Sequence, residues 1–187
     1  MFTEKHVEIL RNGGIGVIPT DTLYGVVGML GNATALEKIK AARHVVEKPN
    51  GWVTLISAID DLQKSAIDPT DTQRHILEKI WPGPFSVGFG NRPGAYRLPA
   101  YSELREFLEK TGPLLAPSAN ITNEPPASNI DEAKAYFGEK VDFYIDSGIL
   151  SGEPSTVIIF EGDRVRIVRE GAGDISLLKD NLVDIIE

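Results

Sequence analysis

Ile18-Pro19-Thr20-Asp21-Thr22-Leu23-Tyr24-Gly25 continues an apolar run and turns at a proline, a pattern typical of a strand that opens into a ligand-binding turn. In extended geometry successive side chains point to opposite faces, so Thr20, Thr22 and Tyr24 would lie on one side. A row of hydroxyls suits a small polar ligand. The alternative is an Asx or Ser/Thr turn, in which these hydroxyls only bond loop amides.

A second apolar run ends in the same manner. Leu114-Leu115-Ala116 is followed by Pro117-Ser118-Ala119-Asn120, again a proline and then small polar groups. Ligands of open α/β sheets bind at the carboxyl ends of strands. The two turns therefore predict one shared pocket, built from segments far apart in the sequence.

Helical and strand-like patterns alternate along the whole chain, which predicts a single α/β domain over residues 1–187, with a mixed sheet covered by helices. The patterns predict helices at 3–11, 34–43, 60–64, 71–80, 102–110 and 130–137. They predict strands at 15–18, 52–57, 85–89, 95–98, 114–116, 141–145, 155–160 and 165–168, followed by a helix-like tail within residues 174–187.

The composition narrows the function. The chain has 187 residues, of which 42% are hydrophobic and 25% charged, as expected of one globular domain. The lack of cysteine excludes disulfides and thiolate sites, and three scattered histidines make a metal site built from side chains unexpected. No apolar run has membrane-spanning length and the N-terminus does not resemble a signal peptide, so we expect a cytoplasmic protein that does not bind membranes.

Charge is unevenly distributed. The net charge of −8 opposes broad attraction to nucleic acid, so tRNA binding is expected to be weak or absent. Four cations nevertheless cluster in one stretch: Lys38, Lys40, Arg43 and Lys48. Such a cluster on an acidic chain fits a phosphate-bearing small ligand, and a solvated helix face is the alternative.

A series of short motifs occurs in the order seen in the threonylcarbamoyl-AMP synthase (YrdC-like) family, which the chain resembles from about residue 10 to residue 173. The motifs are Pro19-Thr20-Asp21-Thr22-Leu23-Tyr24-Gly25, Trp81-Pro82-Gly83-Pro84-Phe85-Ser86, Arg97-Leu98-Pro99, Ala116-Pro117-Ser118-Ala119-Asn120, Ser155-Thr156-Val157 and Val168-Arg169-Glu170-Gly171. The resemblance implies a twisted open sheet with a concave polar cleft.

The resemblance also implies a reaction. Such an enzyme makes threonylcarbamoyl-AMP and pyrophosphate from L-threonine, bicarbonate or CO2, and ATP, and Mg2+ arrives with the ATP. The product supplies the N6-threonylcarbamoyladenosine of tRNA, through hand-over to the tRNA threonylcarbamoyl transferase machinery. Because the reactants are anions, the site needs cations and amide donors that neutralise and align them.

The residue roles follow from the same resemblance. It assigns Thr20, Thr22, Tyr24, Ala116 and Ser155 to the amino acid. It assigns Lys40, Ser86, Ser118, Asn120 and Arg169 to the nucleotide. Arg43 and Lys48 would neutralise phosphate as the catalytic residues. Arg97 is expected to close an ion pair within the fold, and Trp81 to lie in the core.

The chain departs from the family at one cationic motif. Where the family carries Lys-x-Arg, this chain has Arg43-His44-Val45, and a slip of one residue would make Lys40 and Arg43 the pair. Asn50-Gly51-Trp52 stands where one apolar residue usually follows Lys-Pro. The hypotheses are therefore a working synthase, a non-catalytic relative that binds nucleotide or RNA, and a carbamoyl-adenylating enzyme with another acceptor.

Overall fold

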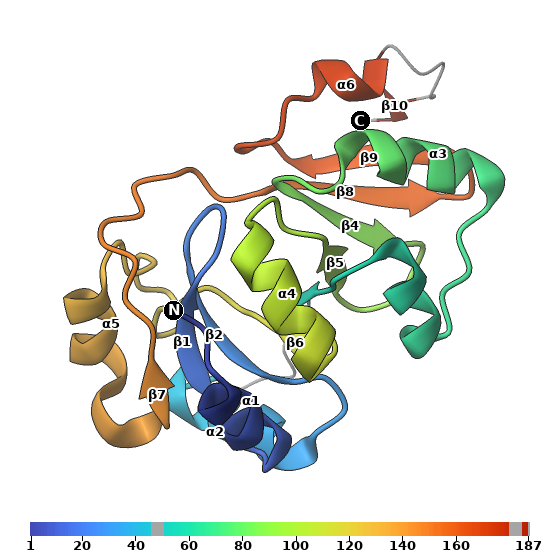
Figure 1. The fold of residues 1–187 in the computed structure, drawn as a ribbon. Helices are drawn as coiled ribbons and strands as arrows, with labels where there is room; N and C mark the ends of the chain where they lie inside the picture. Colours follow the sequence, from blue (N-terminus) through green and yellow to red (C-terminus); the bar gives the residue numbers. More distant parts are fainter. Residues whose placement is uncertain (46–50, 180–184, 187) are drawn as a thin grey trace.

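The computed structural model describes residues 1–45, 51–179 and 185–186 (Figure 1). The strands are β1 (Gly16–Pro19), β2 (Tyr24–Met29), β3 (Val53–Leu55), β4 (Phe85–Phe89), β5 (Ala95–Arg97), β6 (Leu114–Leu115), β7 (Phe143–Tyr144), β8 (Thr156–Glu161), β9 (Arg164–Arg169) and β10 (Ile185–Ile186). The helices are α1 (Glu4–Arg11), α2 (Ala33–Ala42), α3 (Asp71–Ile80), α4 (Ser102–Thr111), α5 (Ile130–Phe137) and α6 (Ser176–Lys179), with 3-10 turns η1 (Ile59–Ser65) and η2 (Gly138–Lys140).

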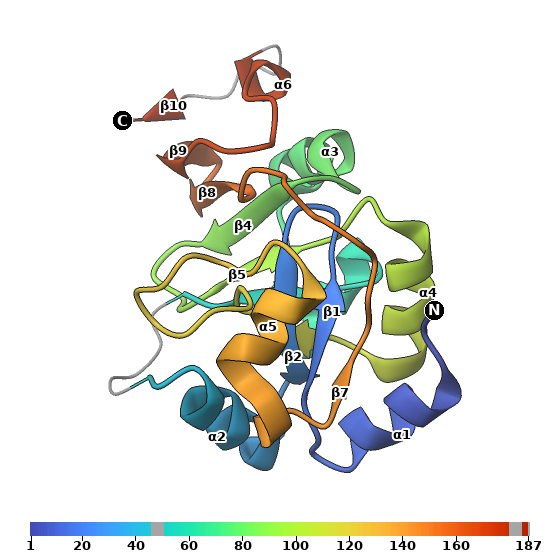
Figure 2. The same cartoon turned by 90° about the vertical axis from the view of Figure 1, so that its left-hand side faces the viewer.

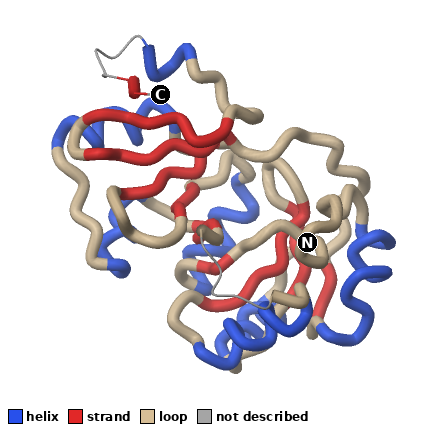
Figure 3. The backbone as a smooth tube through the Cα atoms, turned by 180° about the vertical axis from the view of Figure 1, so that it is seen from behind, coloured by secondary structure: helices blue, strands red, loops and turns tan. Residues whose placement is uncertain are grey.

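These strands form one open mixed sheet in the order β10-β9-β8-β4-β5-β3-β6-β2-β1-β7. The β1–β2 and β8–β9 pairs are antiparallel, whereas β3–β5 and β4–β8 are parallel. Seen from behind, the C-terminal segment lies with the strands at one end of the molecule, away from the N-terminus (Figure 3). The predicted α/β fold with an open mixed sheet is confirmed.

Helices cover both faces of the β1–β2 hairpin, because its apolar side chains alternate. Val17 and Val26 pack against α2 and α5, while Ile18 and Val27 pack against α1 and α4. Figure 2 shows α5 in front of β1 and β2. The hairpin is thus buried on both sides, and the turn at its end is held on a rigid support.

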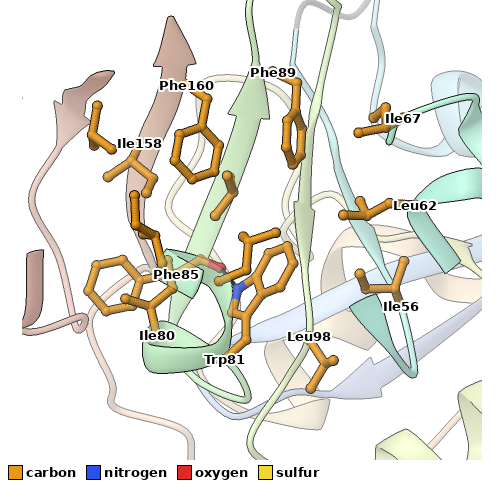
Figure 4. Packing of buried hydrophobic residues seen from close by; sticks show 14 of the residues in the cluster. Ile56, Leu62, Ile67, Ile80, Trp81, Phe85, Phe89, Leu98, Ile158 and Phe160 are labelled. Carbon is orange, nitrogen blue, oxygen red and sulfur yellow. Dashed lines mark hydrogen bonds between the residues drawn. The ribbon is translucent and has the colours of Figure 1, made fainter. Parts of the chain in front are cut away.

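The other end of the sheet has its own apolar core, formed by β4, β8 and β9 with α3 and η1. Trp81 lies inside it beside Phe85 and Ile80 (Figure 4). Its indole Nε1 donates to the carbonyl oxygen of Phe85 at 2.8 Å. The expectation that Trp81 belongs to the core is confirmed.

Local signals explain where several helices begin and end. The side chain of Asn129 accepts a hydrogen bond from the backbone N of Glu132, which caps the start of α5, and Gly138 ends the helix with φ of 50°. Thr70 caps α3 in the same way through the backbone N of Gln73. The predicted bounds of α3, α5 and β4 agree with those observed.

The helix predicted at 60–64 is the 3-10 helix η1, and β3 and β7 are shorter than the strands predicted at 52–57 and 141–145. Strand β2 and the tail differ most from the sequence patterns. Strand β2 was not predicted, since Gly25 and Gly28 interrupt its apolar pattern. A Cβ at Gly28 would lie 2.9 Å from the Cβ of Ala35, so glycine lets α2 approach the sheet. The tail contains the short helix α6 and the strand β10 rather than one helix. In the described residues, no helix is both long and apolar enough to cross a membrane.

Candidate active site

The two polar turns meet because the chain after β6 pairs with the start of β2. The carbonyl oxygen of Pro117 accepts from Val26 N at 2.9 Å, and that of Tyr24 accepts from Ala119 N at 2.8 Å. Strands β1 and β6 both run antiparallel to β2, so their carboxyl ends lie at the same edge of the sheet. Both turns line one cavity of about 260 Å³, which confirms the predicted shared pocket.

The cavity is positively charged. Its polar side chains are three guanidinium groups and several hydroxyls, and the described lining contains no carboxylate. These side chains are Arg43, Arg97 and Arg169, with Thr20, Thr22, Tyr24, Ser118 and Ser155. Guanidinium and hydroxyl donors together bind phosphate and carboxylate groups. The cavity can therefore hold an anion of several oxygen atoms.

The first turn is a Ser/Thr turn. Thr20 Oγ1 accepts from the backbone N of Thr22 and of Leu23, each at 3.2 Å, and donates to the carbonyl oxygen of Leu23 at 2.7 Å. Because Thr20 has one hydroxyl proton, its 3.2 Å contact with Thr22 Oγ1 requires Thr22 to donate. The expected extended geometry through Tyr24 is wrong, because these bonds fold residues 20–23 back into β2.

Arg97 lies beside this turn, at the end of β5. Its Nη1 donates to Thr22 Oγ1 at 2.8 Å, and its Nη2 lies 2.8 Å from Asp21 Oδ1. That second approach is off the hydrogen-bonding axis, so it is an ion pair without a hydrogen bond. The other carboxylate oxygen, Oδ2, accepts from Ala100 N at 2.9 Å. The predicted ion pair is confirmed.

Arg97 is more than a structural partner, because it also lines the cavity. It is 5% exposed, and no hydrogen bond satisfies its Nε within the described structure. Burial lowers the pKa of Arg97, and the charge of Asp21 opposes that shift. A buried guanidinium with an unsatisfied donor favours an anionic neighbour.

Asn120 ties the second turn to the end of α2. Its Oδ1 accepts from Ser118 Oγ at 2.6 Å and from Arg43 Nη2 at 3.2 Å. Its carbonyl oxygen accepts from Arg43 Nε at 3.0 Å, while its Nδ2 donates to the carbonyl oxygens of Ile121 and Glu124. Asn120 is buried and is not among the lining residues. It therefore positions Ser118 and Arg43, which do line the cavity.

Arg43 is the C-terminal cap of α2 and is 8% exposed. No carboxylate of the described chain lies within ion-pair distance of it. Burial lowers the pKa of Arg43, although a guanidinium remains charged in proteins. A buried, unpaired cation facing a cavity favours an anionic ligand, since the ligand would compensate the charge.

The remaining cations of this stretch do not reach the cavity. Lys40 pairs with Glu37 at 2.7 Å, and Lys38 pairs with Asp142 at 3.3 Å. Neither lysine lines the cavity, so the solvated helix face is the better interpretation for both. A slip that pairs Lys40 with Arg43 is not supported, because the two side chains have separate partners.

Val45 and Lys48 are the remaining positions of the cationic motif. Val45 donates its backbone N–H to the carbonyl oxygen of Lys40 at 2.9 Å and does not line the cavity. Lys48, predicted to be catalytic, lies outside the described residues. Within the described residues, Arg43 alone represents the motif in the cavity.

A pair of serines joins β4 to the chain just before β8. Ser86 Oγ is 2.8 Å from Ser155 Oγ, and Ser86 is fully buried behind the lining. Ser155 lines the cavity, and Arg169 Nη2 donates to its carbonyl oxygen at 2.8 Å. A Cβ at Gly171 would overlap the carbonyl oxygen of Pro154, so this glycine lets the chain after β9 approach. Ser86 thus supports Ser155 and is not itself in the lining.

Ala116 lies between the second turn and β3. Its backbone N donates to the carbonyl oxygen of Val53 at 2.8 Å, and Ala116 lines the cavity. The backbone group that it can offer to a ligand is therefore its carbonyl oxygen, which suits a substrate amine.

The phenol of Tyr24 anchors a loop. Its hydroxyl donates to the carbonyl oxygen of Gly148 at 2.9 Å and accepts from Ser147 N at 2.9 Å. The loop then passes the first turn so closely that a Cβ at Gly152 would lie 2.9 Å from the carbonyl oxygen of Thr22. Tyr24 is among the lining residues, but its hydroxyl is occupied by this loop.

Replacing Tyr24 with phenylalanine should therefore loosen the loop of residues 146–154. We expect a loss of about 1 kcal/mol in the free energy of unfolding, and faster thermolysin cleavage near Ile149 and Leu150. Tyr144→Phe is the matched control, because its hydroxyl also donates to one carbonyl oxygen, that of Gly138 at 2.7 Å. Equal cleavage of the loop in both variants would contradict the anchoring role.

Among the lining residues with polar or aromatic side chains, sequence reasoning missed Arg97 and Trp52. Arg97 enters the lining through the parallel register of β3 and β5, which sets Val53 opposite Ala95 and Leu55 opposite Arg97. All four line the cavity, as alternation along two paired strands requires. Nothing in the motifs indicated Trp52.

Comparison with known proteins gives this cavity a context. A family model described as "Telomere recombination", which covers Sua5, YciO and YrdC proteins, matches residues 8–171. A Methanocaldococcus jannaschii protein is 31% identical over 184 residues, which cover 90% of this chain and 86% of the relative. A Mycobacterium leprae protein is 26% identical over 193 residues, covering 94% and 86% respectively. Both relatives carry the provisional name threonylcarbamoyl-AMP synthase.

Solved structures have the same fold. Pyrococcus abyssi Sua5 in complex with L-threonine superposes with a TM-score of 0.86 at 22% identity. The match covers 97% of this chain and 58% of Sua5, so the chain spans little more than half of that protein. Escherichia coli YciO superposes with a TM-score of 0.80 at 25% identity, covering 92% of this chain and 90% of YciO.

Proposed function

Because the chain belongs to the Sua5/YciO/YrdC family, we propose that it is an L-threonylcarbamoyladenylate synthase. It would form threonylcarbamoyl-AMP and pyrophosphate from L-threonine, bicarbonate or CO2, and ATP. The observation that carries the proposal is the cavity itself, in which three guanidinium groups and several hydroxyls converge without a carboxylate among the described lining residues. Such a lining suits a triphosphate beside a carboxylate.

The reaction joins two anions. The amine of threonine and CO2 give a carbamate, and a carbamate oxygen then attacks the α-phosphorus of ATP. A new oxygen–phosphorus bond forms while the bond from the α-phosphorus to the bridging oxygen breaks, so pyrophosphate leaves. The protein's part is to align the reactants and to stabilise the growing negative charge, and fixed cations in a partly dry cavity do both.

The lining residues divide these tasks. Thr22, the carbonyl oxygen of Ala116 and Ser155 would contact the amino acid. Arg43, Ser118 and Arg169 would contact the nucleotide phosphates. Thr20, Tyr24, Ser86 and Asn120 support these groups, since their hydrogen bonds are directed to turn amides, a loop, Ser155 and Arg43 respectively.

Mg2+ would enter with ATP. In the part of the chain that the structure describes, no group of three or more His, Asp or Glu side chains is gathered for a metal. The cavity side chains with oxygen atoms are hydroxyls, so the phosphates would supply the ion's charged ligands. The ion supplies neutralisation of the leaving pyrophosphate, and Arg43 and Arg169 would add to it.

The product would serve N6-threonylcarbamoyladenosine formation in tRNA, after transfer to the threonylcarbamoyl transferase machinery in the cytoplasm. Threonylcarbamoyl-AMP is a mixed anhydride and reacts with water. A direct hand-over would therefore protect it, and the net charge of −8 favours a protein partner over direct tRNA binding.

Pyrophosphate release by the purified protein tests the proposal. We expect release that needs MgATP, L-threonine and bicarbonate together, with the adenylate identified by mass spectrometry. Release with another amino acid, but not with threonine, would show that the enzyme uses another acceptor. Nucleotide binding without pyrophosphate under any of these conditions would contradict the synthase and favour a binding relative.

A further inference from the structure

Arg43 lines the cavity and has no counter-ion among the described residues, and its orientation depends on the groups around it. Asn120 accepts from Nε and Nη2 of Arg43, which fixes one edge of the guanidinium plane. The backbone of Arg43 is held separately, because both the N–H and the hydroxyl of Thr122 donate to its carbonyl oxygen. These bonds lie along one edge of the guanidinium and do not restrain its flat faces.

The guanidinium of Arg43 lies over the ring of Trp52. Arg43 Cζ lies 5.7 Å from the centroid of the Trp52 ring, within the range of a cation–π contact. The backbone of Trp52 is held, because its carbonyl oxygen accepts from Ala95 N at 3.2 Å as the chain enters β3. Gly51 precedes it with φ of 88°, a conformation that glycine adopts without strain. The half-buried indole also lines the cavity.

We propose that Trp52 is a positioning residue that aims Arg43 at the anionic substrate. Asn120 and Trp52 would together hold the guanidinium in one plane, with the Nη1 hydrogens directed to the ligand. The inference rests on the proposed nucleotide substrate but concerns a residue that the family motifs do not include. The chain departs from the family sequence at Asn50-Gly51-Trp52, and the inference assigns a role to this Trp52. It would support Arg43, since Val45 supplies no second cation.

The charges near Arg43 agree with this role. Lys38 and Lys40 have acidic partners of their own, Asp142 and Glu37, and neither lysine lines the cavity. Arg97, another lining residue, is paired with Asp21. An aromatic face compensates part of a buried positive charge and does not compete with the ligand as a carboxylate would. Arg43 therefore stays available to an incoming phosphate.

Tryptophan fluorescence tests whether the ligand binds beside Trp52. The chain has two tryptophans, and Trp81 is buried in the core with its Nε1 bonded to Phe85. A change in emission on adding MgATP, or inorganic pyrophosphate, should therefore come from Trp52 and vanish in Trp52→Phe. Affinity for both ligands, followed by calorimetry, should fall about threefold to thirtyfold in Trp52→Leu and less in Trp52→Phe, which keeps an aromatic face.

A double-mutant cycle with Arg43 tests whether Trp52 acts through it. In the Arg43→Met background, Trp52→Leu should cause no further loss of affinity, since the guanidinium is gone. Lys38→Met is the control for removing a cation of the same helix and should bind as the wild type. Thermal unfolding of every variant checks that the fold is kept, and Trp52→Met, which also removes the aromatic face, serves if Trp52→Leu is unstable.

The outcomes separate this inference from the synthase proposal. If the wild type binds MgATP but makes no adenylate, the synthase proposal fails, while the binding cycle still decides the role of Trp52. Equal losses from Trp52→Leu with and without Arg43 would overturn the positioning role. Unchanged affinity in Trp52→Leu, or no binding of either anion by the wild type, would also overturn it.

Discussion

Replacing Arg43 with methionine should lower kcat/KM for ATP by about a hundredfold, because the variant loses charged donors aimed at the reacting phosphates. Arg43 is buried, lines the cavity and has no described carboxylate partner, so its charge is directed to a ligand rather than to the fold. The loss should appear mainly in kcat if Arg43 stabilises the transition state, and in KM if it only binds ATP. Steady-state pyrophosphate release separates the two.

Two further variants sharpen this test. Arg43→Lys keeps the charge but cannot bond Asn120 through a planar fork, so we expect it to recover a part of the loss only. Lys40→Met should stay within about twofold of the wild type, because Lys40 is paired with Glu37 outside the cavity. A loss in Lys40→Met equal to that in Arg43→Met would restore the hypothesis that these two cations form the functional pair.

The fold was predictable from sequence wherever local chemistry decides the structure. The proline and glycine residues around the helices, and the caps at Thr70 and Asn129, give boundaries that tertiary contacts do not override. The meeting of the two polar turns followed from the general position of ligand sites in open sheets. β2 was missed because Gly28 serves packing against α2, which no local pattern reveals.

The candidate site was predictable as a set of residues but not as a set of roles. Thr22, Ser118, Ser155 and Arg169 do line the cavity. Asn120 and Ser86 come from the same motifs, yet their polar atoms are bonded to neighbours behind the lining. Hydrogen bonds between distant segments decide which of two adjacent hydroxyls faces a ligand. The sequence of either segment alone does not predict these bonds.

The second large effect is expected at Arg97. Replacing it with methionine should lower the free energy of unfolding by about 3–5 kcal/mol, because Asp21 would be left as a buried charge without a counter-ion. The two side chains are 6% and 10% exposed, so water cannot take the place of the guanidinium. Urea denaturation of the wild type and the variant measures the loss. A change below 1 kcal/mol would mean that Asp21 reaches solvent on its own.

Asp21→Asn combined with Arg97→Met should return most of that stability, since both charges of the buried pair are then removed together. It should not return full activity. Arg97 pairs with Asp21 through Nη2 and donates to Thr22 through Nη1. The double variant removes the unpaired charge of Asp21, but the hydroxyl of Thr22 still lacks its donor. We expect KM for the amino acid to stay about tenfold above the wild-type value. If stability and KM recover together, Arg97 serves the fold alone; if stability returns while KM stays high, one guanidinium serves the fold and the site through different nitrogen atoms.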